Sequence, residues 1–454
     1  MIGRSAVDGR AERTARRQSR TRWAVGVLGV VALLAAACSS SSKTASTSGT
    51  GGGNTASAPG VTATSITIGS HQPLTGQAAP GYSEIAPAAK AMFEYINSKG
   101  GVNGRTINYI YKDDAYNPSQ TSTVVRQLVE QDHVFGIFNG LGTPTHQQVE
   151  SFLNAEKVPD VFVASGCTCW NDPSKAPYTF GYQTNYAIEG RILGNYINNN
   201  FKGKKVGYLL QDDDVGTGGE QGLDSELPSS SVVSKQKYAV SALGSGLGDQ
   251  MSALQRAGAQ VVVLFAIPAA AALALLASAQ INYHPQFVAS SIDADVHTLA
   301  GLISSFSKGK AAAALLDGIL TASYLPSPND TSNSWIQLYQ KIHDTYDKNE
   351  PFDANAVYGM SVAYNFTQVL QKAGHDLTRQ DFVDAMNSAN LTGPGLLPLT
   401  FSSSDHGGYK GESMAKFSST AVTLFGPVYQ TDMSGPITTY TGGQPSPPAN
   451  LTAG

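Results

Sequence analysis

The chain has 454 residues, of which 41% are hydrophobic, and a formal net charge of −4 at pH 7. This length allows two domains with complete hydrophobic cores, and the acidic balance argues against nucleic acid as a partner. The sequence contains no G-x-S-x-G, H-E-x-x-H or P-loop motif, and these motifs carry nucleophile, metal or phosphate chemistry in many enzymes. We therefore expect a protein that is not an enzyme and needs no cofactor or metal.

The N-terminus predicts an export signal, residues 1–37. A basic segment precedes an apolar run of fifteen residues from Trp23 to Ala37. A membrane-spanning helix needs about 20 apolar residues, so this run is typical of a signal peptide. The run ends in Leu34-Ala-Ala-Ala-Cys38, which resembles the lipobox of bacterial lipoproteins and marks Cys38 for lipidation. An ordinary signal peptide with an incidental cysteine is the alternative, and both the general and the twin-arginine export routes stay open.

Residues 38–63 predict a tether between a lipid and a folded body. From Ser39 to Pro59 the chain is almost wholly Ser, Thr, Gly, Ala and Asn. Such a composition cannot bury enough apolar surface to offset the entropy that is lost on ordering. We expect an extracytoplasmic protein, held on the outer face of the cell membrane by the lipid on Cys38. Removal of residues 1–37, with seven Arg and two acids, would change its net charge to −9.

The rest of the chain alternates strand and helix patterns. Strands are expected at residues 65–69, 107–111, 134–138, 161–164, 206–210, 232–240, 261–265 and 287–290. Helices are expected at residues 85–99, 118–131, 144–156, 187–199, 219–227, 248–257 and 269–280. Repeated β-α units predict parallel sheets with helices on both faces, and the rhythm restarts after residue 164. In such sheets ligands bind outside the carboxyl ends of the strands.

Several motifs occur in a recognisable order. They are Ile66-Thr-Ile-Gly69, Pro73-Leu-Thr-Gly76, Ile96-Asn-Ser-Lys-Gly-Gly-Val-Asn-Gly-Arg105, Asp113-Asp114, Leu128-Val-Glu-Gln131, Gly203-Lys-Lys-Val206, Gln211-Asp-Asp213, Tyr358-Gly359 and Phe425-Gly-Pro427. Over residues 64–440 this order resembles the leucine/isoleucine/valine-binding family of type I periplasmic binding proteins. The resemblance implies an α/β fold with two doubly wound parallel-sheet lobes, joined by a three-stranded hinge, that close on a ligand.

The resemblance also implies a domain plan and a function. Lobe 1 is expected at residues 64–183 and 323–400, lobe 2 at 184–322 and 401–441, and a flexible tail at 442–454. The crossings between the lobes are expected near Gln183, Ala322 and Thr400. The implied protein is a monomeric solute-binding receptor that delivers an amino-acid-like or less polar organic solute to the permease subunits of an ABC importer. A ligand-sensing module for a signalling partner and a periplasmic amide hydrolase are the alternatives.

By the same resemblance, two loops of lobe 1 contact the ligand. Leu141-Gly142-Thr143 and Ala164-Ser165-Gly166 match loops in which the family holds an α-carboxylate with hydroxyl and amide groups. A helix N-terminus after Thr143 would add backbone donors. Tyr82 matches an aromatic wall of the site. Turn or capping roles for Thr143 and Ser165, and simple packing for Tyr82, are the alternatives.

Lobe 2 departs from the family's pattern. Where the family has Asp-x-Tyr-Gly, this chain has Asp213-Asp-Val215-Gly216, and the loop after Phe265 is apolar at Ile267. Asp293 lies near the place of the acid that pairs with the substrate ammonium. These departures favour a less polar ligand, or one that lacks an α-amino group.

Two further clusters have competing interpretations. Cys167 and Cys169 can form a disulfide in an oxidising compartment, but a bridge across one residue is geometrically tight, so a disulfide and free thiols both stay open. Asp293-Ala-Asp295-Val-His297 contains metal-ligating residue types. Because Asp at a helix start is first of all a cap, we expect capping or ligand contact there.

Overall fold

The computed structural model of the chain describes residues 54–309 and 313–452. The expected signal peptide, Cys38 and most of the expected tether lie outside these residues. The described end of the tether, residues 54–63, contacts the first lobe, because the Arg105 guanidinium donates to the carbonyls of Thr55 and Thr62 at 2.9 and 2.7 Å. Within the described ranges, no helix is long and apolar enough to cross a membrane.

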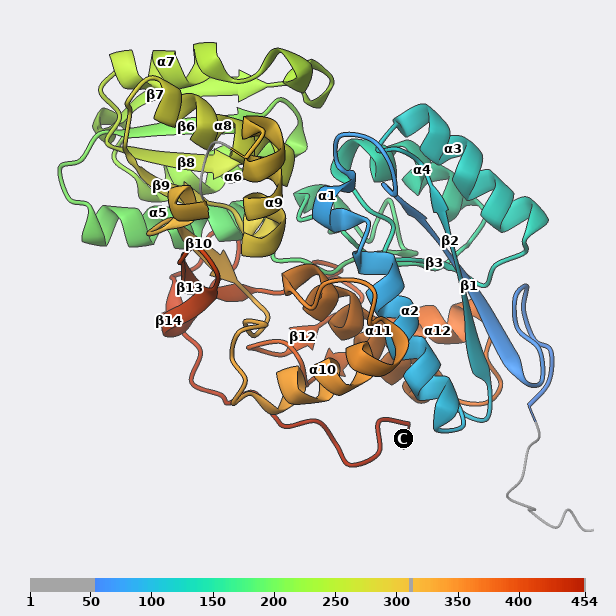
Figure 1. The fold of residues 1–454 in the computed structure, drawn as a ribbon. Helices are drawn as coiled ribbons and strands as arrows, with labels where there is room; N and C mark the ends of the chain where they lie inside the picture. Colours follow the sequence, from blue (N-terminus) through green and yellow to red (C-terminus); the bar gives the residue numbers. More distant parts are fainter. Residues whose placement is uncertain (1–53, 310–312, 453–454) are drawn as a thin grey trace, which may run out of the picture. The chain divides into compact units, whose positions relative to one another are not determined.

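The first lobe is built on a five-stranded parallel sheet with the order β2-β1-β3-β4-β5 (Figure 1). Its strands are β1 (Ser65–Gln72), β2 (Thr106–Asp113), β3 (Ile137–Phe138), β4 (Asp160–Val163) and β5 (Thr179–Gly181). Its helices are α1 (Ala79–Tyr82), α2 (Ile85–Ser98), α3 (Pro118–Arg126), a π-helical turn (Gln127–Gln131), α4 (Thr143–Ala155), α10 (Ser334–Tyr346), α11 (Ala354–Ala373) and α12 (Arg379–Met386). A short hairpin, β11 (Asn390–Leu391) and β12 (Leu399–Thr400), completes it.

Two helical layers cover this sheet. Ile66 and Ile68 of β1 are buried in the cluster that includes Met92 and Phe93 of α2. On the other face, Leu128 and Val149 from the α3–α4 layer pack in a separate cluster. Helices therefore cover both faces of the sheet, which makes the lobe doubly wound. The loops that follow the strands of this sheet gather at one of its edges.

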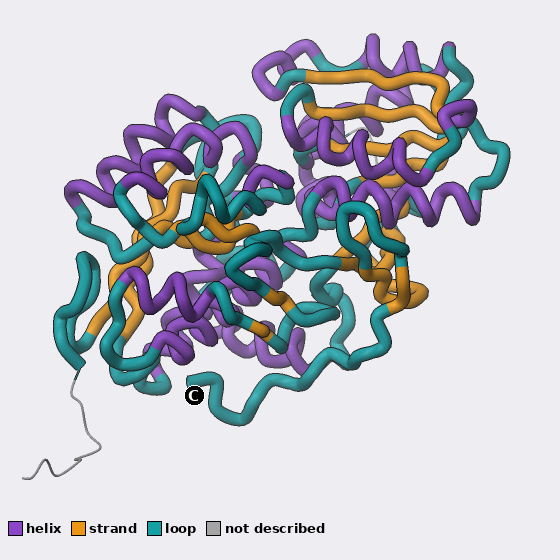
Figure 2. Tube along the Cα trace, turned by 180° about the vertical axis from the view of Figure 1, so that it is seen from behind, coloured by secondary structure: helices purple, strands orange, loops and turns teal. Residues whose placement is uncertain are grey.

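The second lobe contains an eight-stranded mixed sheet with the order β15-β14-β13-β10-β9-β8-β6-β7. Its strands are β6 (Val206–Gln211), β7 (Val232–Tyr238), β8 (Val261–Phe265), β9 (Gln286–Ala289), β10 (Leu320–Ser323), β13 (Gly411–Phe417), β14 (Val422–Gln430) and β15 (Thr438–Thr439). Its helices are α5 (Tyr186–Asn200), α6 (Asp214–Glu226), α7 (Gly248–Arg256), α8 (Pro268–Gln280) and α9 (Val296–Ser307). Figure 2 shows its strands between two helical layers.

The second sheet differs in part from the parallel sheet that the sequence predicts. The strands from β10 to β7 are parallel, but β13 pairs antiparallel with both β10 and β14. The residues between β13 and β14, Ser418–Ala421, form a tight turn in which the Ser418 N–H donates to the Ala421 carbonyl at 2.8 Å. A turn this short can join antiparallel strands only, because parallel strands need a crossover of a dozen or more residues.

Three runs of chain connect the lobes, after β5, β10 and β12. The Tyr409 N–H donates to the Tyr182 carbonyl at 3.0 Å, and the Tyr409 ring stacks on Tyr324 with the centroids 5.0 Å apart. The third run, residues 406–411, therefore lies against the first, somewhat beyond the position near Thr400 that the sequence suggests. These three adjacent runs form the hinge between the lobes.

The C-terminal segment returns to the first lobe after β15. The Trp335 Nε1–H donates to the Pro445 carbonyl at 2.6 Å, and the Gln371 amide donates to the Leu451 carbonyl at 2.9 Å. Leu451 is buried. The described part of the expected tail, residues 442–452, thus contacts both α10 and α11.

Candidate functional site

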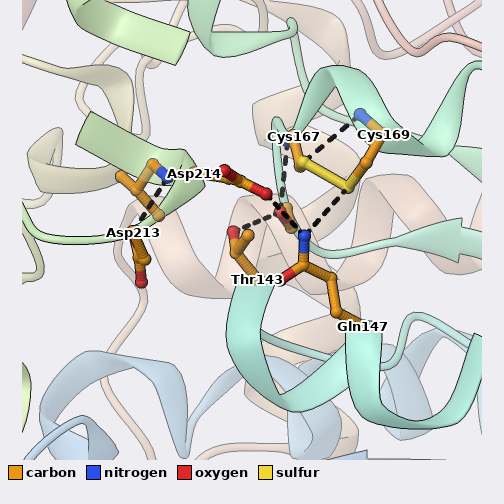
Figure 3. Close-up of a disulfide and its surroundings, with 8 residues drawn as sticks. Thr143, Gln147, Cys167, Cys169, Asp213 and Asp214 are labelled. Carbon is orange, nitrogen blue, oxygen red and sulfur yellow. Dashed lines mark hydrogen bonds between the residues drawn. A yellow bond between two sulfur atoms is a disulfide. The ribbon is translucent and has the colours of Figure 1, made fainter. Parts of the chain in front are cut away.

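The N-terminus of α4 lies at the carboxyl edge of the first sheet. Gly142 precedes it with φ 104°, a left-handed conformation that glycine tolerates, and a Cβ there would collide with Thr145 and Tyr116. Thr143, the first helical residue, is buried, and its hydroxyl oxygen lies 2.6 Å from that of Ser165 (Figure 3). The first N–H groups of a helix lack intrahelical partners, so this position can hold an anion.

The loop after β4 lies directly beside the α4 N-terminus. The Gly142 N–H donates to the Ala164 carbonyl at 3.2 Å, and the Gly166 carbonyl accepts from the Tyr186 N–H at 2.7 Å. A Cβ at Gly166 would lie 2.8 Å from the Tyr186 ring. The structure therefore brings together the two lobe 1 loops expected from the sequence, and places the start of α5 against them.

Four tyrosines surround these loops: Tyr82, Tyr116, Tyr186 and Tyr238. Burial raises the pKa of each hydroxyl above its ordinary value; nearby carboxylates add to all four shifts, and neighbouring tyrosines add to those of Tyr82, Tyr116 and Tyr238. For Tyr186, hydrogen bonds with the Gly166 backbone and the Thr143 and Ser165 side chains oppose the shift in pKa. The tyrosines are therefore neutral donors and acceptors at physiological pH.

An unpaired carboxyl group faces this cluster from the second lobe. Asp293, at the end of the 3₁₀ turn Ser291–Asp293, is 1% exposed, and neither carboxyl oxygen has a hydrogen-bond partner among the described residues. Burial raises its pKa well above the ordinary value, and the charge of Glu189 adds to the shift. The Tyr82 hydroxyl lies 3.5 Å from the carbonyl of Ile292, the residue before Asp293. Asp293 therefore lies beside the tyrosines, and its carboxyl oxygens have no hydrogen-bond partner among the described residues.

The other two residues expected in lobe 2 have backbone roles. Val215 is buried at the start of α6, and its N–H donates to the Asp213 carboxylate at 2.9 Å. The Ile267 N–H donates to the Tyr238 hydroxyl at 3.0 Å, and that hydroxyl donates to the Gln211 side chain at 2.9 Å. Tyr238 from β7 thus provides a tyrosine in the lobe whose Asp-x-Tyr-Gly motif lacks one.

Sequence reasoning missed Tyr116, Tyr186, Tyr238 and Gln211. Tyr116 stands in the turn after β2 with φ 57°, a conformation that local patterns do not reveal. Tyr186 follows the first crossing between the lobes and the Asn185 cap of α5. Its position directly after the hinge could have identified it as a candidate site residue. Tyr238 ends a strand whose carboxyl end was not among the loops considered.

Cys167 and Cys169 form a disulfide, with their Cα atoms 5.1 Å apart. The Gln147 amide donates to the Cys169 sulfur at 3.6 Å and to the Asp214 carboxylate of α6 at 2.6 Å (Figure 3). The sulfurs and the Asp214 carboxylate lie within 4.8 Å of one another, but the disulfide leaves no thiolate for a metal. The disulfide loop instead supports an inter-lobe contact between Gln147 and Asp214.

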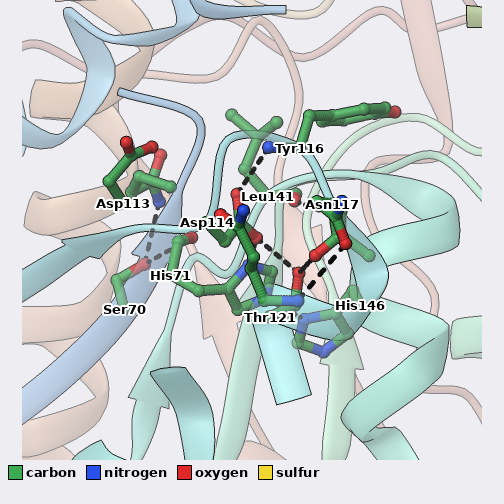
Figure 4. Close-up of polar contacts among 12 residues, drawn as sticks. Ser70, His71, Asp113, Asp114, Tyr116, Asn117, Thr121, Leu141 and His146 are labelled. Carbon is green, nitrogen blue, oxygen red and sulfur yellow. Dashed lines mark hydrogen bonds and ion pairs between the residues drawn. The ribbon is translucent and has the colours of Figure 1, made fainter. Parts of the chain in front are cut away.

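A chain of four buried side chains passes next to Gly140, and Figure 4 labels three of them, Asp114, His71 and His146. Asp114, His71, His146 and Asp160 are linked in this order by contacts of 2.8, 2.9 and 2.8 Å. Burial lowers the pKa of His71, while its hydrogen bond with Asp114 opposes that shift. Asp114 also accepts from the backbone N–H of Tyr116 at 2.9 Å, so this chain fixes Tyr116 beside the loop.

Asp295 joins the two lobes at a second place. As the N-cap of α9, it accepts from the Thr298 N–H at 2.5 Å, and its other oxygen accepts from the Ala354 N–H of α11 at 3.0 Å. The Asn355 amide also donates to the Thr298 hydroxyl at 3.2 Å. Asp295 therefore has the capping role expected for the Asp293–His297 segment, and it caps helices of both lobes.

Comparisons with known proteins agree with this architecture. A family model described as periplasmic binding protein matches residues 65–418. The chain is 31% identical over 170 residues to Leu/Ile/Val-binding protein homolog 2 of Brucella abortus (strain 2308), an alignment that covers 35% of this chain and 42% of the relative. The chain thus matches less than half the length of that curated relative.

Two solved structures are similar over most of the chain. The first is a fatty acid ABC transporter substrate-binding protein from Thermomonospora curvata, with TM-score 0.73, 20% identity and coverage of 83% of this chain and 95% of that chain. The second is a branched chain amino acid ABC transporter from Thermus thermophilus with bound valine, with TM-score 0.69, 18% identity and coverage of 81% and 97%. At these identities, the two structures show a shared fold.

The two hinged α/β lobes and the facing polar groups define a solute-binding fold. The chain belongs to the periplasmic binding protein family, with the type I fold of the branched-chain amino acid-binding group that the sequence motifs predicted. This is a family of extracytoplasmic solute-binding proteins and not of enzymes.

Proposed function

We propose that the chain is the lipid-anchored receptor of an ABC importer and that it binds a small organic carboxylate between its lobes. One observation carries the proposal. In lobe 1, buried hydroxyls stand at the N-terminus of α4, and in lobe 2 the buried, unpaired carboxyl of Asp293 lies near Tyr82 and Tyr238 of the tyrosine cluster. Such uncommitted polar groups are costly to bury unless a ligand pairs with them.

The lobe 1 side suits a carboxylate head group. The hydroxyls of Thr143 and Ser165 share one hydrogen bond at 2.6 Å and also hydrogen-bond with the Tyr186 side chain, so the three hydroxyls form one neutral network that can turn toward a ligand oxygen. Pro144 has no N–H, but the helix dipole and the N–H groups of Thr143 and Thr145 favour negative charge at the same place. The tyrosine hydroxyls are neutral and can donate as well. A carboxylate is therefore held without a formal ion pair.

The lobe 2 side suits either of two ligand groups. Burial raises the pKa of Asp293 and so favours its protonated form, which can donate a hydrogen bond to a neutral ligand oxygen. A ligand ammonium would instead pair with the ionised form and lower the pKa again. Both kinds of ligand share the carboxylate head, and the two similar solved structures are a fatty acid transporter substrate-binding protein and a branched chain amino acid transporter with bound valine; fatty acids and valine are both carboxylate solutes.

Ligand binding to both lobes would stabilise the closed state. The Gln147–Asp214 and Asp295–Ala354 contacts join the lobes at two places. A ligand that contacts both lobes shifts the population toward this arrangement. An importer can then distinguish a loaded receptor from an empty one by its shape.

The ligand class is tested by calorimetry and thermal unfolding with amino acids, unsubstituted monocarboxylates and the matching amides. A carboxylate at 100 times its dissociation constant should raise stability by about 2.7 kcal/mol, whereas the amides should bind far more weakly. Thr143→Val removes a hydrogen bond to a charged group, worth about 1.5–3 kcal/mol, so affinity should fall at least tenfold. Thr217→Val, at an exposed site on α6, is the matched control. Equal binding of acids and amides would contradict the proposal.

The lipid anchor is tested separately with the full-length chain in a bacterial host. Wild-type protein should partition into the detergent phase and incorporate an alkyne-labelled fatty acid. Cys38→Ala should abolish the labelling, because the family of lipoproteins that the N-terminus resembles carries its lipid on this sulfur. Detergent-phase partitioning of the variant equal to that of wild type would contradict the assignment of Cys38.

A further inference from the structure

Two buried imidazoles of lobe 1 are in direct contact. The His71 Nε2 and His146 Nδ1 atoms lie 2.9 Å apart, and the planes of the two rings lie within 20° of each other. Rings that stack face to face stay about 3.5 Å apart, so these rings meet edge to edge, with one nitrogen of each directed at the other. Two nitrogen lone pairs repel each other at this distance. A proton therefore lies between the two rings.

The outer nitrogen of the first ring faces an ionised carboxylate. The His71 Nδ1 atom lies 2.8 Å from Asp114 Oδ2. The Thr121 hydroxyl donates to the same oxygen at 2.7 Å, and the Tyr116 N–H donates to the other oxygen at 2.9 Å. Donors on both oxygens favour the charged form of Asp114. The nearby Tyr116 hydroxyl stays neutral, because burial raises its pKa.

The outer nitrogen of the second ring faces another carboxylate. The His146 Nε2 atom lies 2.8 Å from Asp160 Oδ2, which also accepts the Thr179 hydroxyl at 2.8 Å. The second oxygen of Asp160 has no partner among the described residues, so the carboxylate depends on the imidazole for charge compensation. Glu150, one turn further along α4, is a further titratable side chain that faces the pair. Burial raises the pKa of Glu150, and the charge of Asp160 adds to this shift while His146 opposes it.

The tetrad of Asp114, His71, His146 and Asp160 holds one proton more than two neutral histidines provide. Its three hydrogen bonds need one proton each. Two neutral imidazoles carry one N–H each, and ionised carboxylates carry none. Burial lowers the pKa of His71, which places the additional proton on His146. His146 then donates to both of its neighbours, and the tetrad as a whole carries one negative charge.

The additional proton lies next to the loop that precedes α4. A Cβ on Gly140 would lie 2.5 Å from His71 Nε2 and 2.7 Å from His146 Nδ1, so the backbone of this loop packs directly on the hydrogen bond between the rings. The His146 N–H also donates to the Gly142 carbonyl at 3.1 Å in the first turn of α4. Loss of the proton would drive the rings apart and would leave two negative charges one helical turn from Thr143. Both changes oppose the binding of an anion there.

We propose that the tetrad is a proton-binding site that regulates the receptor: the bound proton holds the loop before α4 in its ligand-binding shape, and release of this proton as the pH rises lowers the affinity for a carboxylate. The effect on affinity rests on the proposed function, whereas the bound proton does not. Two unfolded histidines with the ordinary pKa of 6.5 together hold one proton at pH 6.5. Above this pH, folding takes up protons and stability falls as the pH rises; below it, folding releases protons and stability falls as the pH falls.

Asp114→Asn tests the bound proton, because its amide supplies the third N–H of the tetrad. The amide nitrogen can donate to His71 and Thr121, while the amide oxygen still accepts the Tyr116 N–H. The Thr121 hydroxyl can then donate to the Asn117 carbonyl, which it already approaches at 3.0 Å. With two neutral histidines, every hydrogen bond of the tetrad is made in this variant. Asp114→Asn should therefore fold without the additional proton.

Urea unfolding between pH 5 and pH 8 measures the difference. The ratio of the wild-type unfolding constant to that of Asp114→Asn should rise about tenfold for each pH unit, until the folded wild type releases its proton. Asp160→Asn supplies an N–H from the other end of the tetrad and should give the same slope. Asp249→Asn, at an exposed position on α7, is the matched control, and its ratio should not depend on pH. Glu150 is present in all of these proteins, so its titration cancels in the ratios.

Nitrogen NMR of wild-type protein labelled at histidine needs no variant. At pH 7.5 one buried ring should carry protons on both nitrogens. If every ring carries a single proton, or if wild type and both tetrad variants have parallel unfolding profiles, the bound proton and the whole proposal are wrong.

Calorimetric affinity for the best carboxylate of the panel, measured from pH 6 to pH 9, tests the regulation. Wild-type affinity should fall as the pH rises, and the affinity of Asp114→Asn should not. An equal pH dependence in both proteins would overturn the regulation and leave the bound proton in place. If no carboxylate binds at any pH, the proposed function itself fails, while the unfolding ratios still decide whether the tetrad binds a proton.

Discussion

The inter-lobe contact of Asp295 can be tested by a change that separates its two roles. One oxygen caps α9 through the Thr298 N–H, and the other accepts the Ala354 N–H of lobe 1. Asp295→Ser keeps a good N-cap, because Ser and Asp rank together at this position. The shorter side chain with one oxygen cannot serve both helices, so the contact with α11 is lost. The closed state of the two lobes should become less stable, while α9 stays intact.

The size of the effect follows from two opposing terms. A hydrogen bond to a charged group contributes about 1.5–3 kcal/mol. The opposing term is repulsion among buried carboxyl groups. Burial is the main cause that raises the pKa of Asp353 to about 6 and that of Glu84 to about 9, and the charge of Asp295 adds to both shifts. Asp295→Ser removes this charge and relieves the repulsion. A net loss of about 1–2 kcal/mol in the closed state corresponds to a fall in ligand affinity of about 5- to 30-fold.

The measurement is calorimetric affinity for the best ligand of the panel, combined with urea unfolding of the free protein. Asp295→Ser should lose affinity and keep its free energy of unfolding to within about 0.5 kcal/mol. Asp295→Ala, the comparison variant, should lose affinity and in addition about 1 kcal/mol of stability with the cap. Wild-type affinity in the Ser variant would refute the role of Asp295 in closure.

Three further predictions concern titratable and sulfur groups. Burial raises the pKa of Asp293 above its ordinary value, so Asp293→Asn should stabilise the free protein against thermal unfolding at pH 8. The substitution should lower the affinity only for ligands that bear an ammonium group. An equal loss of affinity for all acids would contradict this. Burial, and then the charge of Asp353, raises the pKa of Glu84 from 4.5 to about 9, so its contribution to stability is greatest below pH 4.5 and declines as the pH rises toward 9. Glu84→Gln should flatten urea-derived stability across that window, and an unchanged slope would count against the shift. Replacing both Cys167 and Cys169 by Ser should lower stability by about 1.5 kcal/mol, the loop-closure value for so short a loop, and reductant should then have no further effect on the variant.

The sequence predicted most elements because their side-chain periods are unambiguous. The apolar run Val261–Phe265 is β8 with the same bounds. The start of α6 was placed at Gly219 but lies at Asp214, where Asp213 caps the helix. Several glycines in this helix weaken its local helix signal, yet they allow α6 to pack closely on α5, since a Cβ at Gly222 would collide with the Ala187 carbonyl. Tertiary packing thus decides a boundary that local propensity obscures.

Site residues that directly follow a strand could be predicted from the sequence, whereas site residues placed by tertiary geometry could not. Thr143 and Ser165 end up 2.6 Å apart because both loops follow adjacent strands of one parallel sheet. Tyr116 and Tyr238 reach the same place from a left-handed turn and an edge strand, and no spacing in the sequence relates them. The contact between Asp295 and α11 depends on lobe closure, which the order of elements does not specify.

The arrangement of helices supports the proposal that a carboxylate binds between the lobes. In a doubly wound lobe, each helix that follows a strand starts at the carboxyl edge of the sheet, so α4 of lobe 1 and α6, α8 and α9 of lobe 2 start beside the cleft. Their N-termini carry partial positive charge, and Asp213 and Asp295 are engaged as caps there. These two carboxylates therefore accept backbone N–H groups, whereas at the start of α4, where Gly142 offers no side-chain acceptor and Pro144 has no N–H, the N–H groups of Thr143 and Thr145 are left for the proposed ligand. A cation without a carboxylate would face helix ends of the wrong polarity, so in the proposed complex the backbone selects the carboxylate head group.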